Sequence, residues 1–146
     1  MIELFWVNAI DNFKTYVANL FYPTTTTTIL EAGDFTLDRL NRNKLPIILF
    51  SSDTLLSLTR IGKGASSNIR YRIWVIDDIT LPQIETKLNL LYRACAEDTT
   101  LNNQFSSSNV ETIDAYLGEG TEPFTLPFSV GYKAGSITIA LNMMEA

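Results

Sequence analysis

The apolar residues of the first twenty-one positions recur at intervals of three and four, and this spacing constrains the fold more than any other feature. Such spacing places apolar side chains along one face of a helix. The residues are Ile2, Phe5, Trp6, Ala9, Ile10, Phe13, Tyr16, Val17, Leu20 and Phe21. The pattern predicts an amphipathic helix that Pro23 ends, because proline lacks a backbone N–H and disfavours a helical conformation in the residue before it.

A second helix is indicated by its start signal. Thr80 stands three residues before Gln83 with Pro82 between them, which is the pattern of a capping box with an early-turn proline. The helix should end near Asp98, and Leu101 and Phe105 should pack beneath the polar loop that follows. Its predicted buried stripe consists of Ile84, Leu88, Leu91, Tyr92 and Cys95.

Strand patterns fill much of the remaining chain. Five consecutive threonines, Thr24–Thr28, favour an edge strand or an extended connector, with low-complexity disorder as the alternative. The apolar run Leu45–Phe50 is typical of a strand buried on both faces, and Glu31–Lys44 before it should be an ordered loop. Further strands are predicted at Val110–Leu117, Phe124–Tyr132 and Ile137–Met143.

The middle of the chain predicts a long β-hairpin. Asp53–Ile61 leads into Gly62–Asn68, a run of small and turn-forming residues that we expect to be a long, mobile tip. Side chains on a strand alternate between its two faces. On the returning strand, one face should therefore belong to the core and the other should be basic with an aromatic side chain beside it. The core set is Ile69, Tyr71, Ile73 and Val75, and the other set is Arg70, Arg72 and Trp74.

These elements predict an α+β fold in which two helices pack on a mostly antiparallel sheet with a long β-hairpin. The chain has 146 residues, of which 46% are hydrophobic, so one domain over residues 1–146 is expected. The charged fraction, 18%, is below the usual quarter. Much of the surface should therefore be neutral or apolar, which suits a subunit packed among copies of itself. No apolar run approaches the roughly eighteen residues of a membrane-spanning helix, and we expect synthesis in the cytoplasm.

Side chains used in catalysis are scarce. The chain has no histidine and one cysteine, Cys95, which lies on the apolar stripe of the second predicted helix and should be a buried, inert thiol. Gly62 and Gly64 lead into a strand rather than a helix, so a hairpin turn is favoured over a phosphate site. Asp77 and Asp78 directly precede a helix, and an interaction with its dipole is favoured over metal or acid–base chemistry. We therefore expect no enzyme activity, no metal and no cofactor.

Charge is unevenly distributed along the chain. The net charge of −5 argues against a non-specific nucleic-acid binder, because affinity for phosphates comes mainly from lysine and arginine. Four of the eleven basic residues lie in the predicted hairpin, and several acidic residues follow the second helix. Two interpretations stay open: a solvated surface, or a contact in which the basic hairpin meets the acidic strand of a neighbouring copy. The candidate interface residues are Arg60, Lys63, Arg70, Arg72, Trp74, Glu111, Asp114, Glu119 and Glu122.

The order of elements and two short motifs resemble the tail-terminator or neck-ring proteins of long-tailed bacteriophages. The motifs are the helix Leu81–Glu97 followed by Asp98-Thr99-Thr100-Leu101-Asn102-Asn103, and the strand Phe128-Ser129-Val130-Gly131-Tyr132. The asparagines after Leu101 depart from the family, which often has glycines there. The resemblance implies a homohexameric ring in the virion that caps the tail tube and joins it to the head-side connector. It also implies other neck and tail proteins as partners, with no cofactor.

Three alternatives remain beside this interpretation. The chain could be another head–tail connector or tail-tube component, or a small monomeric module that covers a basic partner with its acidic surface. An enzyme with a carboxylate site around Asp77 and Asp78 is the third. If the ring interpretation holds, removal of Gly62–Asn68 should leave the domain folded and weaken self-assembly.

Overall fold

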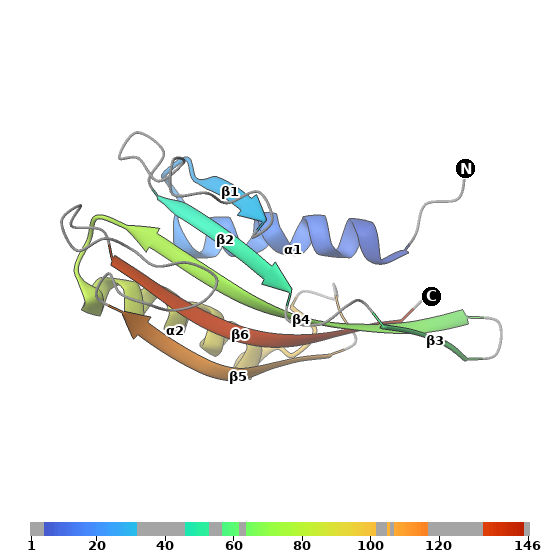
Figure 1. Cartoon of the computed structure of the whole chain (residues 1–146). Coiled ribbons are helices and arrows are strands. Elements are labelled where there is room, and N and C mark those ends of the chain that lie inside the picture. Colours follow the sequence, from blue (N-terminus) through green and yellow to red (C-terminus); the bar gives the residue numbers. More distant parts are fainter. Residues whose placement is uncertain are drawn as a thin grey trace.

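The computed structural model describes residues 5–31, 46–52, 57–61, 64–101, 105, 107–116 and 133–144. Within these ranges the chain forms an α+β fold, as predicted (Figure 1). Both helices lie on the same side of a mixed sheet. The elements are α1 (Phe5–Phe21), β1 (Thr28–Glu31), β2 (Ile47–Ser52), β3 (Ser57–Ile61), β4 (Gly64–Asp77), α2 (Leu81–Glu97), β5 (Ser107–Tyr116) and β6 (Lys133–Met144).

The strands of the described residues form one sheet in the order β1-β2-β4-β6-β5, with β3 also paired to β4. The β1–β2 pair is parallel and the other pairs are antiparallel, so the expectation of a mostly antiparallel sheet is confirmed. Because β2 pairs with residues 71–76 of β4 and β3 pairs with residues 64–68, these two strands follow one another along the same edge of β4.

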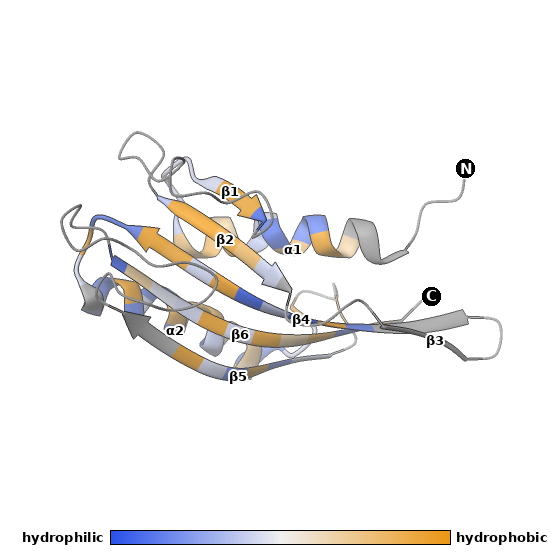
Figure 2. Cartoon of the chain, viewed as in Figure 1, coloured by the Kyte–Doolittle hydropathy of each residue, from blue (hydrophilic) through white to orange (hydrophobic). Residues whose placement is uncertain are grey.

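The core lies between the helices and one face of the sheet, here called the helix face. Figure 2 shows the apolar residues concentrated on β2, β4 and β6. Phe13 of α1 is fully buried at its centre, and its ring packs against Phe50, Tyr71 and Phe105 with centroid distances of 6.2, 6.4 and 5.4 Å. One α1 side chain thus connects β2, β4 and the segment after α2. Outside the core, Lys14 of α1 forms an ion pair with Glu31 of β1.

The predicted ends of the helices are confirmed where they are described. α1 ends at Phe21, two residues before Pro23, while the predicted residues Ile2–Leu4 lie outside the described ranges. At α2 the Thr80 hydroxyl accepts a hydrogen bond from the Gln83 N–H at 3.3 Å, and the Gln83 side-chain oxygen accepts one from the Thr80 N–H at 3.0 Å. Both halves of the capping box therefore form.

The C-terminal end of α2 is a compact turn. Asp98 is its C-cap, and its N–H donates to the Ala94 carbonyl at 2.9 Å. The Asp98 carboxylate accepts hydrogen bonds from the N–H and the hydroxyl of Thr100. Leu101 adopts a positive φ of 47°, a costly conformation for a residue with a branched side chain, and is almost fully buried. Burial of Leu101 and Phe105, both predicted to pack under this loop, offsets that cost.

The strand predictions are largely confirmed. The threonine run leads into an edge strand, since β1 begins at Thr28 and lies at one end of the sheet. Ile47–Phe50 are fully buried on both faces, as expected for this run. The alternating residues of β6 from Ile137 to Met143 point into the core. The predicted strand Phe124–Tyr132 and most of the predicted loop Glu31–Lys44 lie outside the described residues.

The expectation of a long, mobile hairpin tip at Gly62–Asn68 is wrong. Ile61 of β3 pairs with Gly64 of β4, so only residues 62 and 63 separate the paired strands. Residues 64–68 pair with β3 on one side, and from Ser66 onward they also pair with β6 on the other. The hairpin is long because its strands are long. Removal of Gly62–Asn68 would therefore delete part of the central strand rather than a dispensable loop.

Candidate functional site

The candidate interface residues of β4 lie on the sheet face opposite the helices, here called the second face. Alternation places Arg70, Arg72, Trp74 and Ile76 there, with Leu49 of β2 beside Trp74. The exposure of these side chains rises from Ile76 toward Arg70: Ile76 and Trp74 are fully buried, Arg72 is half-buried and Arg70 is exposed. The predicted alternation is confirmed. Trp74, however, is enclosed within its own chain, so its ring is not presented to a neighbouring subunit.

Arg72 is held by contacts within the chain. Its Nε donates a hydrogen bond to the Ser136 hydroxyl oxygen at 3.1 Å, and its guanidinium carbon lies 4.5 Å from the centroid of the Trp74 ring. A guanidinium over an indole face is attracted by the ring quadrupole while its outer edge stays hydrated. Arg72 therefore covers the tryptophan at the border between the buried and exposed parts of the second face.

Arg70 forms an ion pair with an acidic residue of the same chain. Its Nε lies 3.2 Å from Oε1 of Glu111 on β5, and the two side chains are 46% and 32% exposed. The register of β5 shifts between Val110 and Thr112, which makes Glu111 the extra residue of a β-bulge. The ion pair reaches across β6, which lies between the two strands. Two residues assigned by sequence to opposite sides of a subunit contact are thus partners within one subunit.

The remaining candidate interface residues are only partly described. Arg60 lies on β3 in register with Ala65, and Asp114 lies on β5 in register with Ser136. Lys63, Glu119 and Glu122 lie outside the described residues. The structure therefore brings Arg70, Arg72 and Glu111 together on the second face, and places Arg60 near the far end of the hairpin.

Asp77 ties the end of α1 to the end of β4. Its carboxylate accepts hydrogen bonds from the Tyr22 hydroxyl at 2.7 Å and from the Asp78 N–H at 2.7 Å. Neither aspartate lies in the first turn of α2, so the described contact of Asp77 is a tertiary link rather than a dipole interaction. Burial, reinforced by the hydrogen bond to Asp77, raises the pKa of Tyr22 far above its ordinary value.

Lys87 completes this junction from α2. Its ammonium group donates a hydrogen bond to the Phe21 carbonyl at 2.9 Å, and lies 4.0 Å from the centroid of the Tyr22 ring. A cation at the last carbonyls of α1 complements the negative end of the helix dipole. A groove of about 540 Å³ runs beside the junction, with Ile79 and Leu90 on its apolar side. The ionisable groups that line it, Tyr22, Asp77 and Lys87, are all engaged in contacts that tie the end of α1 to β4 and α2.

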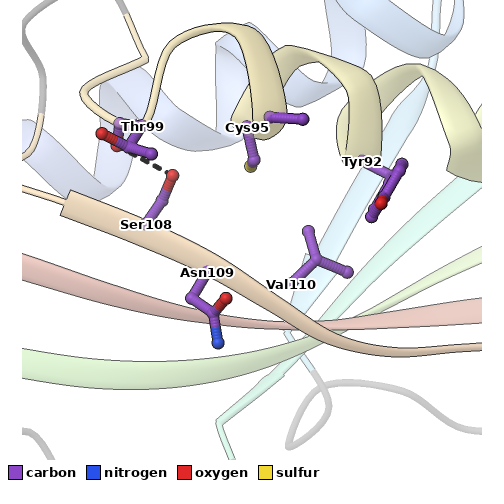
Figure 3. A pocket seen from close by; sticks show the side chains of 7 residues that line it. Tyr92, Cys95, Thr99, Ser108, Asn109 and Val110 are labelled. Atoms are coloured by element: carbon purple, nitrogen blue, oxygen red, sulfur yellow. Dashed lines mark hydrogen bonds between the residues drawn. The ribbon is translucent and has the colours of Figure 1, made fainter.

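A smaller pocket of about 240 Å³ lies between α2 and β5 (Figure 3). Tyr92 and Cys95 line it from the helix, and Ser108 and Val110 line it from the strand. Tyr92 is exposed, so its predicted place in the buried stripe of α2 is wrong, because its ring lies at the open edge beside β5. The Ser108 hydroxyl donates to the Thr99 carbonyl at 2.8 Å. Cys95 is buried as predicted, and burial raises the pKa of its thiol, which keeps the sulfur protonated and a poor nucleophile. The pocket is a hollow beside an edge strand, and sequence reasoning missed it because its shape depends on how α2 packs against β5.

No group of three or more potential metal ligands occurs among the described residues. Neither described helix is long and apolar enough to cross a membrane. Comparisons with models of known protein families and with curated protein sequences yield no match.

Proposed function

We propose that this chain is a structural subunit of a homo-oligomeric ring of the tail-terminator or neck-ring class, which caps a phage tail tube and joins it to the head-side connector. The class comes from the resemblance of the element order and the α2 motif. One feature of the structure supports this proposal more than any other. It is the arm, which consists of β3 and the first half of β4.

The arm extends beyond both helices (Figure 1). β4 is 14 residues long, and its first five residues pair with β3 instead of continuing along β2. β6 runs beside β4 from Ser66 to Asp77, so the base of the arm has three strands in continuous register. The arm therefore continues the pairing of the sheet as it reaches away from the body of the domain.

A strand ladder needs cover on at least one face, because backbone pairing alone leaves its apolar side chains in water. The core beneath the helices reaches as far as Ile69 of β4 and Met143 of β6, which are both buried, and the rest of the arm extends past both helices (Figure 1). A neighbouring subunit is a simple source of cover, since a ring places the arm of every copy against the next one. This supports a role in assembly rather than in chemistry.

The Arg70–Glu111 ion pair changes how charge contributes to this role. Because these two side chains partner each other within the chain, they are not required to attract a neighbouring copy. Exposed pairs of this kind contribute about 1 kcal/mol or less. We therefore propose that paired strand edges and apolar contacts hold neighbouring subunits together, and that charged residues affect only how the subunits are oriented.

The test is the mass of the purified full-length chain over a range of concentrations. We expect light scattering and native mass spectrometry to give a closed oligomer, six copies by the resemblance, and negative-stain micrographs to show rings. A single-chain mass at all concentrations, up to hundreds of micromolar, would contradict the proposal. A tight one-to-one complex of that monomer with a basic protein would favour the adaptor alternative.

A further inference from the structure

Three exposed apolar side chains mark the two outer edges of the sheet. Ile29 on β1 is 39% exposed, Ile113 on β5 is 38% exposed, and Tyr92, on α2 beside β5, is 48% exposed. β1 and β5 are the terminal strands of the described sheet. Scattered exposed apolar residues are ordinary. Here, however, they gather at the two positions where another strand could be added.

Both isoleucines point toward the same side of the sheet. Ile29 is in register with Ile48, and Ile113 is in register with Ile137. Residues in register on neighbouring strands share a face, and both partners belong to the core cluster beneath the helices. Ile29 and Ile113 therefore lie on the helix face, at opposite edges. The α2–β5 pocket, which Tyr92 lines, lies on this face as well.

The directions of the edge strands are also compatible. β1 runs parallel to β2, β2 is antiparallel to β4, β4 to β6, and β6 to β5. Following these pairs across the sheet makes β1 antiparallel to β5. A rotation about an axis along the strands preserves both the direction of each strand and the side on which the helices lie. Copies arranged around such an axis would each bring β1 antiparallel to β5 of the next copy.

We propose that β1 of one copy adds to the outer edge of β5 of the next copy, with Ile29 packed against Ile113 and beside Tyr92. This inference rests on the proposed ring and names the junction that builds it. The added strand pairs with β5 after the bulge, along Thr112–Tyr116, which is long enough for the four residues of β1. Main-chain hydrogen bonds hold the strand, and its outward isoleucine selects the partner edge.

The small area of this junction argues for a closed ring of copies. Four paired residues bury much less than the roughly 1,000 Å² that a stable interface needs, so one junction would not hold a dimer. In a ring every subunit has two such junctions, and closure makes the last one intramolecular. A symmetric pairing of β5 with β5 would use one edge and leave Ile29 exposed on both copies. The head-to-tail arrangement covers both edges at once.

Disulfide trapping in the full chain tests the junction. Ile29→Cys and Ile113→Cys are combined in one chain, and a second double variant with Ile29→Cys and Ala115→Cys allows for a register shift of two residues. The two positions of each pair lie on opposite edges of the sheet, so a disulfide can form only between copies. Cys95 stays in place because it is buried. Ile29→Cys combined with Leu90→Cys is the matched control, since Leu90 is also 39% exposed but lines grooves with Tyr22 and Tyr16, on the side of α2 toward α1.

After mild oxidation we expect at least one edge-pair variant to give a non-reducing ladder that ends at the mass of the ring. The Leu90 control and the single-cysteine variants should stay as single chains. If wild type forms rings and neither edge pair crosslinks, the junction is wrong while the proposed function stands. Crosslinked dimers of either single variant would show like-with-like pairing and overturn the inference. A monomeric wild type would remove the proposed function itself.

Discussion

Replacing Phe13 with alanine should cost the fold about 4 kcal/mol. Truncation of a buried phenylalanine costs about 3–5 kcal/mol through lost burial and the cavity left behind. Phe13 is fully buried, and its ring meets three other aromatic rings at centroid distances of 5.4–6.4 Å, within the range of favourable aromatic pairs. Loss of these pairs places the expected value in the upper half of that range. Most single domains have only about 5–15 kcal/mol of stability in total.

Urea denaturation followed by circular dichroism, at one fixed protein concentration, measures this cost. With a slope of about 2 kcal/mol per molar, a typical value for a small domain, the midpoint should fall by about 2 M. Phe13→Leu keeps most of the volume and should lose clearly less, while Thr15→Ala on the exposed side of α1 should shift stability by about 0.5 kcal/mol or less. A midpoint for Phe13→Ala within about 0.25 M of wild type, the shift that about 0.5 kcal/mol gives at this slope, would refute the central role of this ring.

Substitutions at three other places in the fold have equally specific expected outcomes. Thr80→Ala removes one half of the capping box and should cost about 1 kcal/mol in thermal or urea denaturation, whereas Thr80→Ser should restore most of it. Burial raises the pKa of Tyr71 to about 12 from its ordinary 10, so the unfolded chain ionises first as pH rises. The free energy of unfolding should therefore not change through Tyr71 below pH 10, and should fall by about 1.4 kcal/mol per pH unit between pH 10 and 12. Tyr71→Phe should remove that part of the fall. A double-mutant cycle with Arg70→Met and Glu111→Gln should give a coupling of about 1 kcal/mol or less that vanishes in high salt; a larger, salt-independent value would show that the pair is less hydrated than its exposure indicates.

Much of the fold could be predicted because its signals are local. The three-and-four spacing of α1 and the Thr80–Gln83 pattern depend on residues within one or two helical turns, and both are confirmed. The alternation along β4 was also readable, since a period of two needs no knowledge of the partner strand. Burial on both faces of Ile47–Phe50 followed from an uninterrupted apolar run.

The errors and omissions concern contacts between distant segments. Residues 64–68 have the composition of a loop, yet all of them pair with β3 and residues 66–68 also pair with β6, and this pairing overrides the local preference. The enclosure of Trp74 depends on where other parts of the chain pack, which alternation alone does not reveal. The bulge at Glu111 was equally hidden, because a bulge is defined by register with β6.

The Arg70–Glu111 pair shows why opposite charges in a sequence do not identify a subunit interface. A cluster of basic residues and a cluster of acidic residues attract each other whether they belong to one chain or to two, and here β6 brings one such pair to 3.2 Å within a single chain. The exposed isoleucines differ in this respect, because Ile29 and Ile113 lie on opposite edges of the sheet and cannot meet within one molecule. Exposed apolar residues that cannot contact each other within one chain are therefore better indicators of self-association than charged residues that already form ion pairs within the chain. By that reasoning the edges β1 and β5, rather than the arginines of β4, are where substitutions should change the proposed ring assembly.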